Sequence, residues 1–545
     1  MYNLARLHEA VAEAIPDREC LVYRDRRFTW QQVTDRTRRL AAVIKGAGLG
    51  CHTERSELEN WESGQDHVGL YLYNGNEYLE GMLGAFKART APFNVNYRYV
   101  EKELLYLFEN ANAKAIIYHA AFVPVLEKLR DRLPQVKLWL QVADDSGNGL
   151  LPGAIDYEQA LAQAVPEPLA DEVSKDDLYI LYTGGTTGMP KGVIWRNEDI
   201  HRAALAAGGV AESIEALQER VKARAQMRSL PSPPFMHGAA HWVVFNMWHI
   251  GATVFVQSDV ERFNPDDIWS TIEREKINAV TIVGDAFARP LMDQLEKKKY
   301  DLSSLSLVTS GGAIFTAGLK KELLGHLPHI RIMDALGSSE TGAQAQHFST
   351  KDSGISTGKF DMTEGNIVLS DDLTHPLDAG SEEIGWLARA GLVPLGYYDD
   401  EEKTAKTFPV IDGVRYSVPG DRAMIEADGR LKLLGRDSVT INSGGEKIFA
   451  EEVELALKDH IGVYDAVVCG TPNARFGSQV TALVQLREGA SADEAGLKQH
   501  ASQSIAAYKL PKKFVFVETI VRAPSGKADY RWAKETAMRA LGIDE

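Results

Sequence analysis

The sequence predicts an α/β protein with a large N-terminal domain of helix-covered sheets and a small α+β C-terminal domain. The chain has 545 residues, more than one hydrophobic core supports, so we expect at least two domains. Up to about residue 310, apolar strand-like runs alternate with helical patterns, which is typical of parallel sheets covered by helices. After about Ile384, short strands and many turns replace that alternation.

Helical periodicity opens the chain, over residues 4–15 and 31–46. HVGLYLY (67–73) is a predicted strand, and NEYLEGMLGAFKA after it is a predicted helix. Two further strands, 113–119 and 136–142, flank the helical stretch AFVPVLEKLRDRL. Later, the strands GATVFVQ, INAVTIV and LSLVTSGG are separated by the helical stretches DDIWSTIEREK and FARPLMDQLEKK. The polar, patternless stretch 52–66 predicts a surface insertion.

The C-terminal part begins near a predicted hairpin whose tip is ADGR, between DRAMIE and LKLLGR. A helix in AEEVELALKDH follows, then strands in VYDAVVCGTPN and QVTALVQL and a helix in DEAGLKQHASQSI. We therefore expect domains spanning 1–436 and 437–545.

Composition narrows the functional class. The net charge of −16 argues against nucleic acid as a partner, because phosphate backbones attract clustered Lys and Arg. Three sparse cysteines, Cys20, Cys51 and Cys469, suit a reducing compartment and predict a cytoplasmic protein. The N-terminus has early acidic residues, so we expect no signal peptide. His241–Gln257 is apolar but too short and interrupted for a membrane span, and we expect a buried helix followed by a strand.

The stretch LYTGGTTGMPKGV, Leu181–Val193, is unusually rich in glycine and threonine. It follows the predicted strand DDLYILYT, and such a loop can direct backbone N–H groups and hydroxyls at a phosphate. It is not a P-loop, because Lys191 follows Pro190 and precedes Gly192. A plain turn is the alternative.

Seven motifs occur in an order that resembles the adenylate-forming superfamily of acyl-CoA synthetases, peptide-synthetase adenylation domains and luciferases. They cover almost the whole chain. They are YTGGTTGMPKG, SGGA (310–313), DALGSSETG (334–342), GYYDDEEKTAKTF (396–408), YSVPGD (416–421), GRDSVTINSGGEKIFAEEVE (435–454) and PSGKADY (524–530).

The resemblance implies a two-step reaction with ATP, Mg²⁺ and coenzyme A. A carboxylate attacks the α-phosphorus of ATP to give an acyl-adenylate and pyrophosphate, and a thiol then displaces AMP. The first step needs a grip on the phosphates, by positioning and charge neutralisation.

The resemblance assigns the ATP site residue by residue. The expected ATP-binding residues are Thr183, Gly184, Gly185, Thr186, Thr187, Gly188, Lys191, Gly311, Gly312, Ala313, Asp334, Ala335, Leu336, Gly337, Ser338, Ser339, Asp421, Arg436 and Lys527. Two of these positions depart from the family's pattern. The family usually has Ser where this chain has Gly184, and an aromatic residue where it has Leu336.

Glu340 and Thr183 are the expected magnesium ligands, since Mg²⁺ prefers oxygen donors. The alternative for Glu340 is an acid at a helix N-terminus near Ser338 and Ser339. Asp421 is expected to accept hydrogen bonds from the ribose hydroxyls, and its alternative is a turn residue. Arg436 is expected to contact ribose or phosphate, and its alternative is a surface ion pair.

Lys527 corresponds to the family's catalytic lysine, which stabilises charge in the adenylating transition state. The resemblance also implies that the small domain is mobile and rotates between the two half-reactions. The expected hinge is Asp437 or Ser438. The stretch with Ser443, Gly444, Gly445 and Glu446 is expected to meet coenzyme A during thioester formation.

The acyl group is expected to lie near PSPPFMHGAAHW (231–242) and VGDAF (283–287). Small apolar walls leave volume for a large hydrophobic acid. The stretches YLYNGNEYLEGMLGAFKARTAPFNVNYRY (71–99) and INSGGEKIFAEEVE (441–454) resemble bacterial fatty-acyl and steroid-side-chain acyl-CoA synthetases, which implies such an acid. The expected acyl-binding residues are His237, Ala239, Ala240, Val283, Gly284 and Gly342. His237 is expected to act as a catalytic gate beside the carboxylate, along with catalytic Lys191, Glu340 and Lys527. Its alternative is a hydrogen-bonded core histidine.

The sequence thus predicts an AMP-forming acid–thiol ligase, an ATP-dependent acyl-CoA synthetase. Two alternatives stay open: a stand-alone enzyme that loads a separate carrier protein, and a catalytically impaired relative that acts as a binding protein. A homodimer also remains open.

Overall fold

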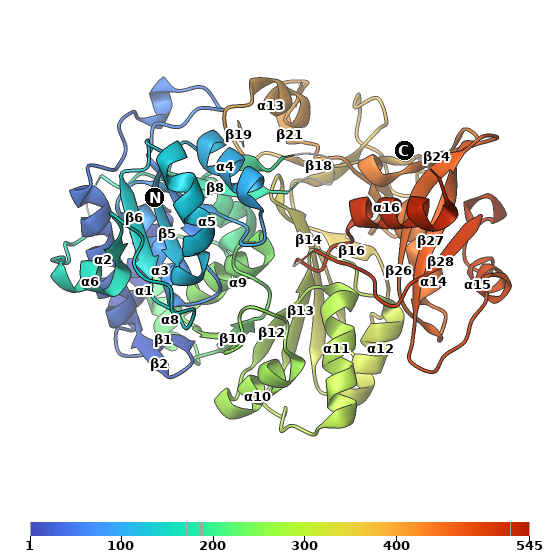
Figure 1. Cartoon of the computed structure of the whole chain (residues 1–545), viewed down its shortest axis with the longest axis horizontal. Coiled ribbons are helices and arrows are strands. Elements are labelled where there is room, and N and C mark those ends of the chain that lie inside the picture. Colours follow the sequence, from blue (N-terminus) through green and yellow to red (C-terminus); the bar gives the residue numbers. More distant parts are fainter. Residues whose placement is uncertain (1, 170–171, 185–188, 524, 544–545) are drawn as a thin grey trace.

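The structure is a computed structural model that describes residues 2–169, 172–184, 189–523 and 525–543. Two large sheets form the N-terminal part, and a third, five-stranded sheet forms the C-terminal part. In Figure 1 the C-terminal part, orange to red, lies at one end of the molecule beside α11 (Gly284–Lys297) and α12 (Ala317–His326). The predicted fold class, a large helix-covered α/β domain followed by a small α+β domain, is confirmed.

The eight-stranded sheet carries the glycine-rich loop. Its strands, in spatial order, are β19 (Gly396–Tyr397), β9 (Lys191–Arg196), β8 (Leu178–Thr183), β4 (Ala91–Asn94), β3 (His67–Tyr71), β5 (Ala113–His119), β6 (Leu138–Val142) and β7 (Ile155–Asp156). Pairing is parallel from β8 to β7, as predicted, and antiparallel between β8 and β9.

The fifteen-stranded sheet carries the other predicted motifs. Its strands, in spatial order, are β2 (Arg26–Thr29), β1 (Glu19–Tyr23), β11 (Thr253–Val256), β10 (Arg228–Pro231), β12 (Ala279–Ile282), β13 (Leu307–Gly311), β14 (Arg331–Ser338), β15 (Gly342–Ser349), β16 (Lys359–Met362), β23 (Leu431–Arg436), β22 (Asp421–Ile425), β18 (Gly385–Ala390), β21 (Val414–Ser417) and β20 (Val410–Ile411), with β17 (Asn366–Leu369) beside β18. The strands from β1 to β14 are parallel, and antiparallel pairing begins at β14–β15.

Helices cover both sheets where the periodicity predicted them. The remaining α-helices of the N-terminal part are α1 (Leu4–Ala14), α2 (Trp30–Gly46), α3 (Asn76–Lys87), α4 (Glu101–Asn110), α5 (Val123–Leu129), α6 (Tyr157–Gln163), α7 (Asn197–Ile200), α8 (Ile214–Ala223), α9 (Gly238–Trp248), α10 (Pro265–Glu275) and α13 (Glu401–Thr407). The helix-then-strand prediction for 241–257 is confirmed by α9 and β11. The helix α3 is buried along its whole length between sheet and helices, so its apolar run serves the core.

The third sheet has the order β25 (Glu446–Ile448), β24 (Ile441–Ser443), β27 (Gly477–Leu486) and β26 (Val463–Asn473), with β28 (Lys513–Phe516) beside β27. The helices α14 (Ala450–Lys458), α15 (Glu494–Ala501) and α16 (Tyr530–Leu541) belong to this part. It has its own apolar cluster, which includes Ile448, Val453, Leu457, Val468 and Leu497.

Within the described residues, no helix is both long and apolar enough to cross a membrane. The three cysteines are free, and Cys20 and Cys469 are buried.

Candidate active site

Lys191 follows the glycine-rich loop and starts β9. It pairs across the β8–β9 ladder with Thr183, so both lie at the loop's base. Its Nζ lies 3.1 Å from Oδ2 of Asp400, the N-cap residue of α13. Among the described residues, a Cβ added at Gly184 would meet only the Tyr99 hydroxyl, at an ordinary 3.5 Å, so none of them requires glycine there. Gly185, Thr186, Thr187 and Gly188 lie outside the described residues, and their predicted roles stay predictions.

Glu340 lies in the turn between β14 and β15, so the alternative of a helix N-terminus is wrong. The turn is closed by the Thr341 N–H, which donates to the Ser338 carbonyl at 3.2 Å. The Glu340 side chain is buried. Its Oε1 accepts a hydrogen bond from the Tyr397 hydroxyl at 2.9 Å, and its backbone carbonyl accepts one from Ser417 Oγ at 2.6 Å.

Tyr397 and Asp400 are site residues that sequence reasoning did not single out, although both lie in the motif GYYDDEEKTAKTF. Tyr397 orients Glu340, and Asp400 holds Lys191. The contacts span 57 and 209 residues of sequence. No local pattern signals such pairs, so the motif was the only available clue.

Asp421 and Arg436 face each other on neighbouring strands. They are paired in the β22–β23 ladder, and Arg436 Nε lies 3.1 Å from Asp421 Oδ1. Asp421 is the main cause that raises the pKa of Arg436, and Glu340 also raises it. The predicted ribose acid and its neighbouring arginine therefore lie close to Glu340. Arg436 thus forms an ion pair while its side chain stays 39% exposed, as its alternative supposes, and its contact with ribose or phosphate stays a prediction.

Lys527 brings the small domain to the same place. Its side chain is solvent-accessible and lies near charged residues of the large domain, in the region that we call the cleft. The surrounding protein lowers the pKa of Lys527, as does Arg436, whereas Glu340 and Asp421 raise it. Hence the four charged residues from distant motifs share one cleft.

The approach of Lys527 depends on Gly526. This glycine is buried, with φ at +75°, and an added Cβ would lie 2.8 Å from Val283 Cγ1. Arg522 fixes the turn because it donates to the Gly526 carbonyl at 3.1 Å and pairs with Asp465 at 2.7 Å. A side chain at position 526 would therefore push the small domain away from the large one.

Further contacts join the two domains. The Tyr464 hydroxyl on β26 donates to Asp293 Oδ2 on α11 at 3.2 Å. The Arg289 guanidinium lies 5.4 Å from the centroid of the Tyr464 ring. A cavity of about 440 Å³, lined by both domains, adjoins these contacts and reaches Gly526. Its shape therefore depends on how the small domain is placed.

His237 precedes α9 and has an unpaired nitrogen. Its Nε2 is enclosed and has no hydrogen-bond partner among the described residues. Burial, together with the nearby charge of Lys527, lowers the pKa of His237 to about 3, so the ring is neutral. The alternative of a fully hydrogen-bonded core histidine is wrong for Nε2. His241, by contrast, has a partner on each ring nitrogen, the Tyr179 hydroxyl and the Phe235 carbonyl.

The predicted adenine wall is largely accessible. Gly312, Ala335 and Gly337 are exposed, and Gly311, Ala313, Leu336, Ser338 and Ser339 are partly exposed. Gly311 pairs with Ala335 across β13 and β14, so the two stretches form one continuous surface. Asp334 differs, because it is buried in an ion pair with Lys320 of α12. Its carboxylate therefore has a protein partner, and we assign it to the support of the wall.

The six predicted acyl-binding residues divide into two groups. Ala239 and Val283 lie 4.0 Å and 3.8 Å from the position of an added Cβ on Gly312, so they adjoin the nucleotide wall, as His237 adjoins Lys527. Ala240 is fully buried in the main core. An added Cβ on Gly342 would lie 3.1 Å from Ala203, and on Gly284 2.2 Å from the Ile314 carbonyl. Close packing therefore restricts side-chain size at the two glycines, and Ala240 contributes to the core.

The predicted coenzyme A residues lie elsewhere. Ser443 and Glu446 flank Gly444 and Gly445 at the tip of the β24–β25 hairpin, and all but the half-exposed Ser443 are exposed. In Figure 1 β24 lies at the upper edge of the small domain, away from α11. In this arrangement Gly526, beside Lys527, lies against Val283 of the large domain, whereas an added Cβ on Gly445 would meet no described atom within 4 Å.

The predicted hinge lies between the last strand of the fifteen-stranded sheet and the first strand of the five-stranded sheet. Strand β23 ends at Arg436, and Asp437 and Ser438 form a short 3-10 helix before β24. Asp437 pairs with Arg422 at 2.9 Å. The Arg436 N–H donates to Glu451 Oε1 of α14 at 3.4 Å. The link between the domains is thus bonded to the large domain through Arg422 and to the small domain through Glu451.

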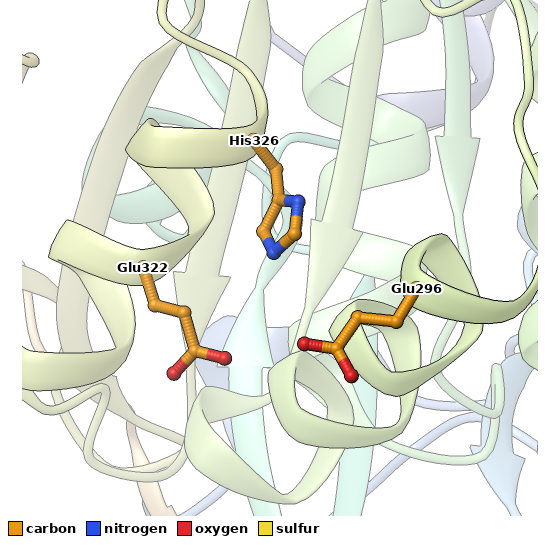
Figure 2. A group of neighbouring side chains, drawn as sticks. All are labelled: Glu296, Glu322 and His326. Carbon is orange, nitrogen blue, oxygen red and sulfur yellow. The ribbon is translucent and has the colours of Figure 1, made fainter.

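Away from the cleft, Glu296 of α11 and Glu322 and His326 of α12 point toward one another (Figure 2). Glu322 also lies 4.0 Å from Arg487 of the small domain. The group is largely exposed, and exposed acidic groups commonly hold no ion, so it does not define a metal site.

Known proteins share this architecture. A family model described as AMP-binding enzyme matches residues 8–385, and one described as AMP-binding enzyme C-terminal domain matches residues 452–527. The chain is 51% identical over 542 residues to a medium-chain acyl-CoA ligase of Mycobacterium avium, covering 98% of both chains.

It is 40% identical to a 3-oxocholest-4-en-26-oate–CoA ligase of Rhodococcus rhodochrous, covering 98% of this chain and 96% of the other. The crystal structure of an anthranilate CoA ligase with anthranoyl-AMP has the same fold, with a TM-score of 0.84 and 22% identity over 99% of this chain and 98% of that one. This chain belongs to the AMP-binding enzyme family.

Proposed function

We propose that this protein is an ATP-dependent acyl-CoA synthetase for hydrophobic carboxylic acids, either medium- to long-chain fatty acids or steroid side-chain acids. A carboxylate oxygen would attack the α-phosphorus of ATP, and the thiol of coenzyme A would then displace AMP from the acyl-adenylate. The relatives support this proposal, because those named above are acyl-CoA and steroid-acid CoA ligases.

One observation carries the proposal. Lys527 of the small domain lies in the cleft where Arg436, Glu340 and Asp421 act on its charge. Lys191, at the base of the glycine-rich loop, lies in the same region. It contacts Asp400, and Tyr397 of the same motif donates a hydrogen bond to Glu340. Fixed positive groups from both domains suit a reaction that builds negative charge between a carboxylate and a phosphate.

Glu340 and Thr183 would hold Mg²⁺. Both supply oxygen donors, which a hard cation prefers. Among the described residues, no Lys or Arg forms an ion pair with the buried Glu340 carboxylate, so its charge fits a bound cation. When bound, the ion would neutralise phosphate charge.

Neutral His237, Ala239 and Val283 would adjoin the reacting carboxylate and the start of the acyl tail. The hairpin with Gly444 and Gly445 would meet coenzyme A after the small domain rotates about Asp437 and Ser438. We place the domain boundary after Arg436, because the fifteen-stranded sheet ends there in sequence and a separate sheet begins at Ile441.

The test is a panel of acids, from short-chain to steroidal, with ATP and either coenzyme A or a carrier protein. Pyrophosphate and the thioester product are both measured. Hydrophobic acids should release pyrophosphate and form acyl-CoA. Thioester only on the carrier would favour the carrier-loading alternative, and no response to any acid would favour the binding protein.

Substituting Ala239 tests the acyl wall. Ala239→Phe should shift preference toward shorter acids, because the added ring occupies the space beside Gly312. Ala240→Ser changes a neighbouring core position and serves as a control for disturbance of α9. An unchanged acid profile in Ala239→Phe would show that the acyl tail lies elsewhere.

A further inference from the structure

A second lysine lies at the phosphate end of the cleft, beside Lys191. Lys403 is the third residue of α13, whose N-cap is Asp400. Asp400 Oδ1 accepts the Lys403 backbone N–H at 3.0 Å, while its Oδ2 accepts Lys191 Nζ at 3.1 Å. One carboxylate therefore joins the start of the helix to the lysine at the base of the glycine-rich loop.

The Lys403 side chain turns back toward the site. Its Nζ lies 4.7 Å from the centroid of the Tyr397 ring, and the hydroxyl of that ring donates to Glu340. Partial burial lowers the pKa of Lys403 to about 8, with Lys191 lowering it and Glu340 and Asp400 raising it. The ammonium groups of Lys191 and Lys403 therefore lie near each other, with Glu340 close by.

Two neighbouring ammonium groups repel each other. Asp400 contacts both lysine residues, but its single negative charge cannot balance two ammonium groups. Glu340 is the expected ligand of a magnesium ion. A polyanion between the two lysines would remove the repulsion. Lys406, one turn farther along α13, is exposed and has no such neighbours in the described structure.

We propose that Lys403 is a second cationic ligand of the β- and γ-phosphates of ATP, and of the pyrophosphate that leaves, acting beside Lys191. This inference rests on the proposed function and deepens it. In adenylation, the carboxylate oxygen bonds to the α-phosphorus, and the bond from that phosphorus to the β-bridging oxygen breaks. Pyrophosphate takes the electron pair, and a fixed ammonium beside it stabilises the growing charge.

The second half-reaction contains no β- or γ-phosphate. There the thiol sulfur bonds to the acyl carbon, its proton is released, and AMP leaves with the electron pair of the broken carbon–oxygen bond. Lys403 should therefore matter for the first half-reaction alone.

The experiment compares Lys403→Ala, Lys403→Arg and the control Lys406→Ala. Lys403→Ala should lower kcat/KM for ATP about tenfold and raise the inhibition constant of pyrophosphate similarly. That is below the ~10²-fold or greater effect of removing a preorganised donor, because Lys191 remains and Lys403 is half-exposed. Lys403→Arg should recover most of the loss, and Lys406→Ala should match the unmodified protein. All variants should convert supplied acyl-adenylate and coenzyme A at the unmodified rate.

Unchanged kcat/KM and pyrophosphate inhibition in Lys403→Ala would overturn the proposal, as would equal loss in both half-reactions. Calorimetric titration with magnesium pyrophosphate gives a separate readout that needs no turnover. If the unmodified protein responds to no acid yet binds pyrophosphate through Lys403, the proposed function fails and this inference stands. If it turns over normally and Lys403→Ala binds pyrophosphate equally well, only this inference fails.

Discussion

Two glycine-containing loops of the small domain lie in opposite surroundings. Gly526 is buried against the large domain, where an added Cβ would lie 2.8 Å from Val283. Gly445 is exposed, and an added Cβ would meet nothing within 4 Å. Gly526 has no room for a side chain because the large domain lies against it, whereas Gly445 faces open space in this arrangement. The small domain therefore contacts the large domain through the Lys527 loop and leaves the tip of the β24–β25 hairpin open, as the proposed division between adenylation and thioester formation requires.

The Lys527 loop and the β24–β25 hairpin also differ in charge and anchoring. Lys527 shares its cleft with Arg436, Glu340 and Asp421, and its turn is fixed by Arg522. The hairpin is held mainly by its own ladder and by the Gly444 N–H, which donates to the Phe476 carbonyl at 3.0 Å. The first loop is thus anchored beside charged residues of the large domain, whereas the second is anchored only within the small domain among the contacts described.

The largest expected effect is that of Lys527→Ala. Pyrophosphate release from acid and ATP should fall by roughly 10²-fold or more, the order seen when one preorganised electrostatic group is lost. The side chain is solvent-accessible, so the melting temperature should change little. Near-normal pyrophosphate release would remove Lys527 from the site.

Gly445→Trp should produce the opposite result on the other face. Pyrophosphate release should persist, while acyl-CoA formation falls by about tenfold or more. The reason is that a bulky ring would occupy the space in which the hairpin is proposed to contact coenzyme A. Gly489→Trp is the matched control, since Gly489 also has positive φ and open space. Equal losses in the two variants would mean that backbone strain, and not the hairpin's position, is responsible.

A smaller effect should follow from Gly526→Val, which leaves every charged group in place. The strain of positive φ and the clash with Val283 should weaken adenylation roughly tenfold, as expected from 1–3 kcal/mol of overpacking. Val283→Ala should partly restore pyrophosphate release in the double variant. No recovery on relieving the clash would show that Gly526 serves the turn and not the approach of the domains.

The smallest expected effect is on pH dependence at the link between the domains. Burial, together with the nearby charge of Glu454, raises the pKa of Glu451 to about 7. A carboxyl whose pKa is raised on folding stabilises the folded state below its unfolded pKa, and that contribution is lost as pH rises through about 7. Glu451→Gln has no proton to lose there.

Melting temperatures at pH 5.5 and pH 8.0 measure the pH-dependent contribution of Glu451 to stability. The difference between Glu451→Gln and the unmodified protein should grow by about 1–3 °C toward pH 8. Glu488→Gln, at an exposed position, controls for the loss of one negative charge. A difference that stays constant with pH would show that Glu451 does not titrate in this range.

The sequence predicted the framework and the charged centre well, for identifiable reasons. Strands such as β5 and helices such as α2 follow local periodicity, and Glu340, Asp421 and Lys527 stand in ordered motifs. The alternative of a helix start at Glu340 arose because two serines precede the acid, whereas antiparallel pairing of β14 with β15 makes that stretch a turn. Parallel strands were predicted, but the antiparallel extension of the large sheet has no strong local signal.

Non-local contacts account for what was missed. Tyr397 and Lys403 gain their surroundings from Glu340 and Lys191, which are far away in sequence, and nothing in their own segment signals those contacts. Ala240 looked like a pocket wall beside Ala239, but only the helix placement shows that it faces the core. Small residues alone cannot separate open space from close packing.

The central claim is that Lys527 serves adenylation and that thioester formation uses another face of the same domain. The most direct measurement supplies chemically made acyl-adenylate and coenzyme A to Lys527→Ala and compares acyl-CoA formation with that from acid and ATP. The account predicts a rate from acyl-adenylate close to that of the unmodified protein, with the rate from acid and ATP reduced about 10²-fold or more. Equal loss of both reactions in a variant with an intact melting transition would contradict it.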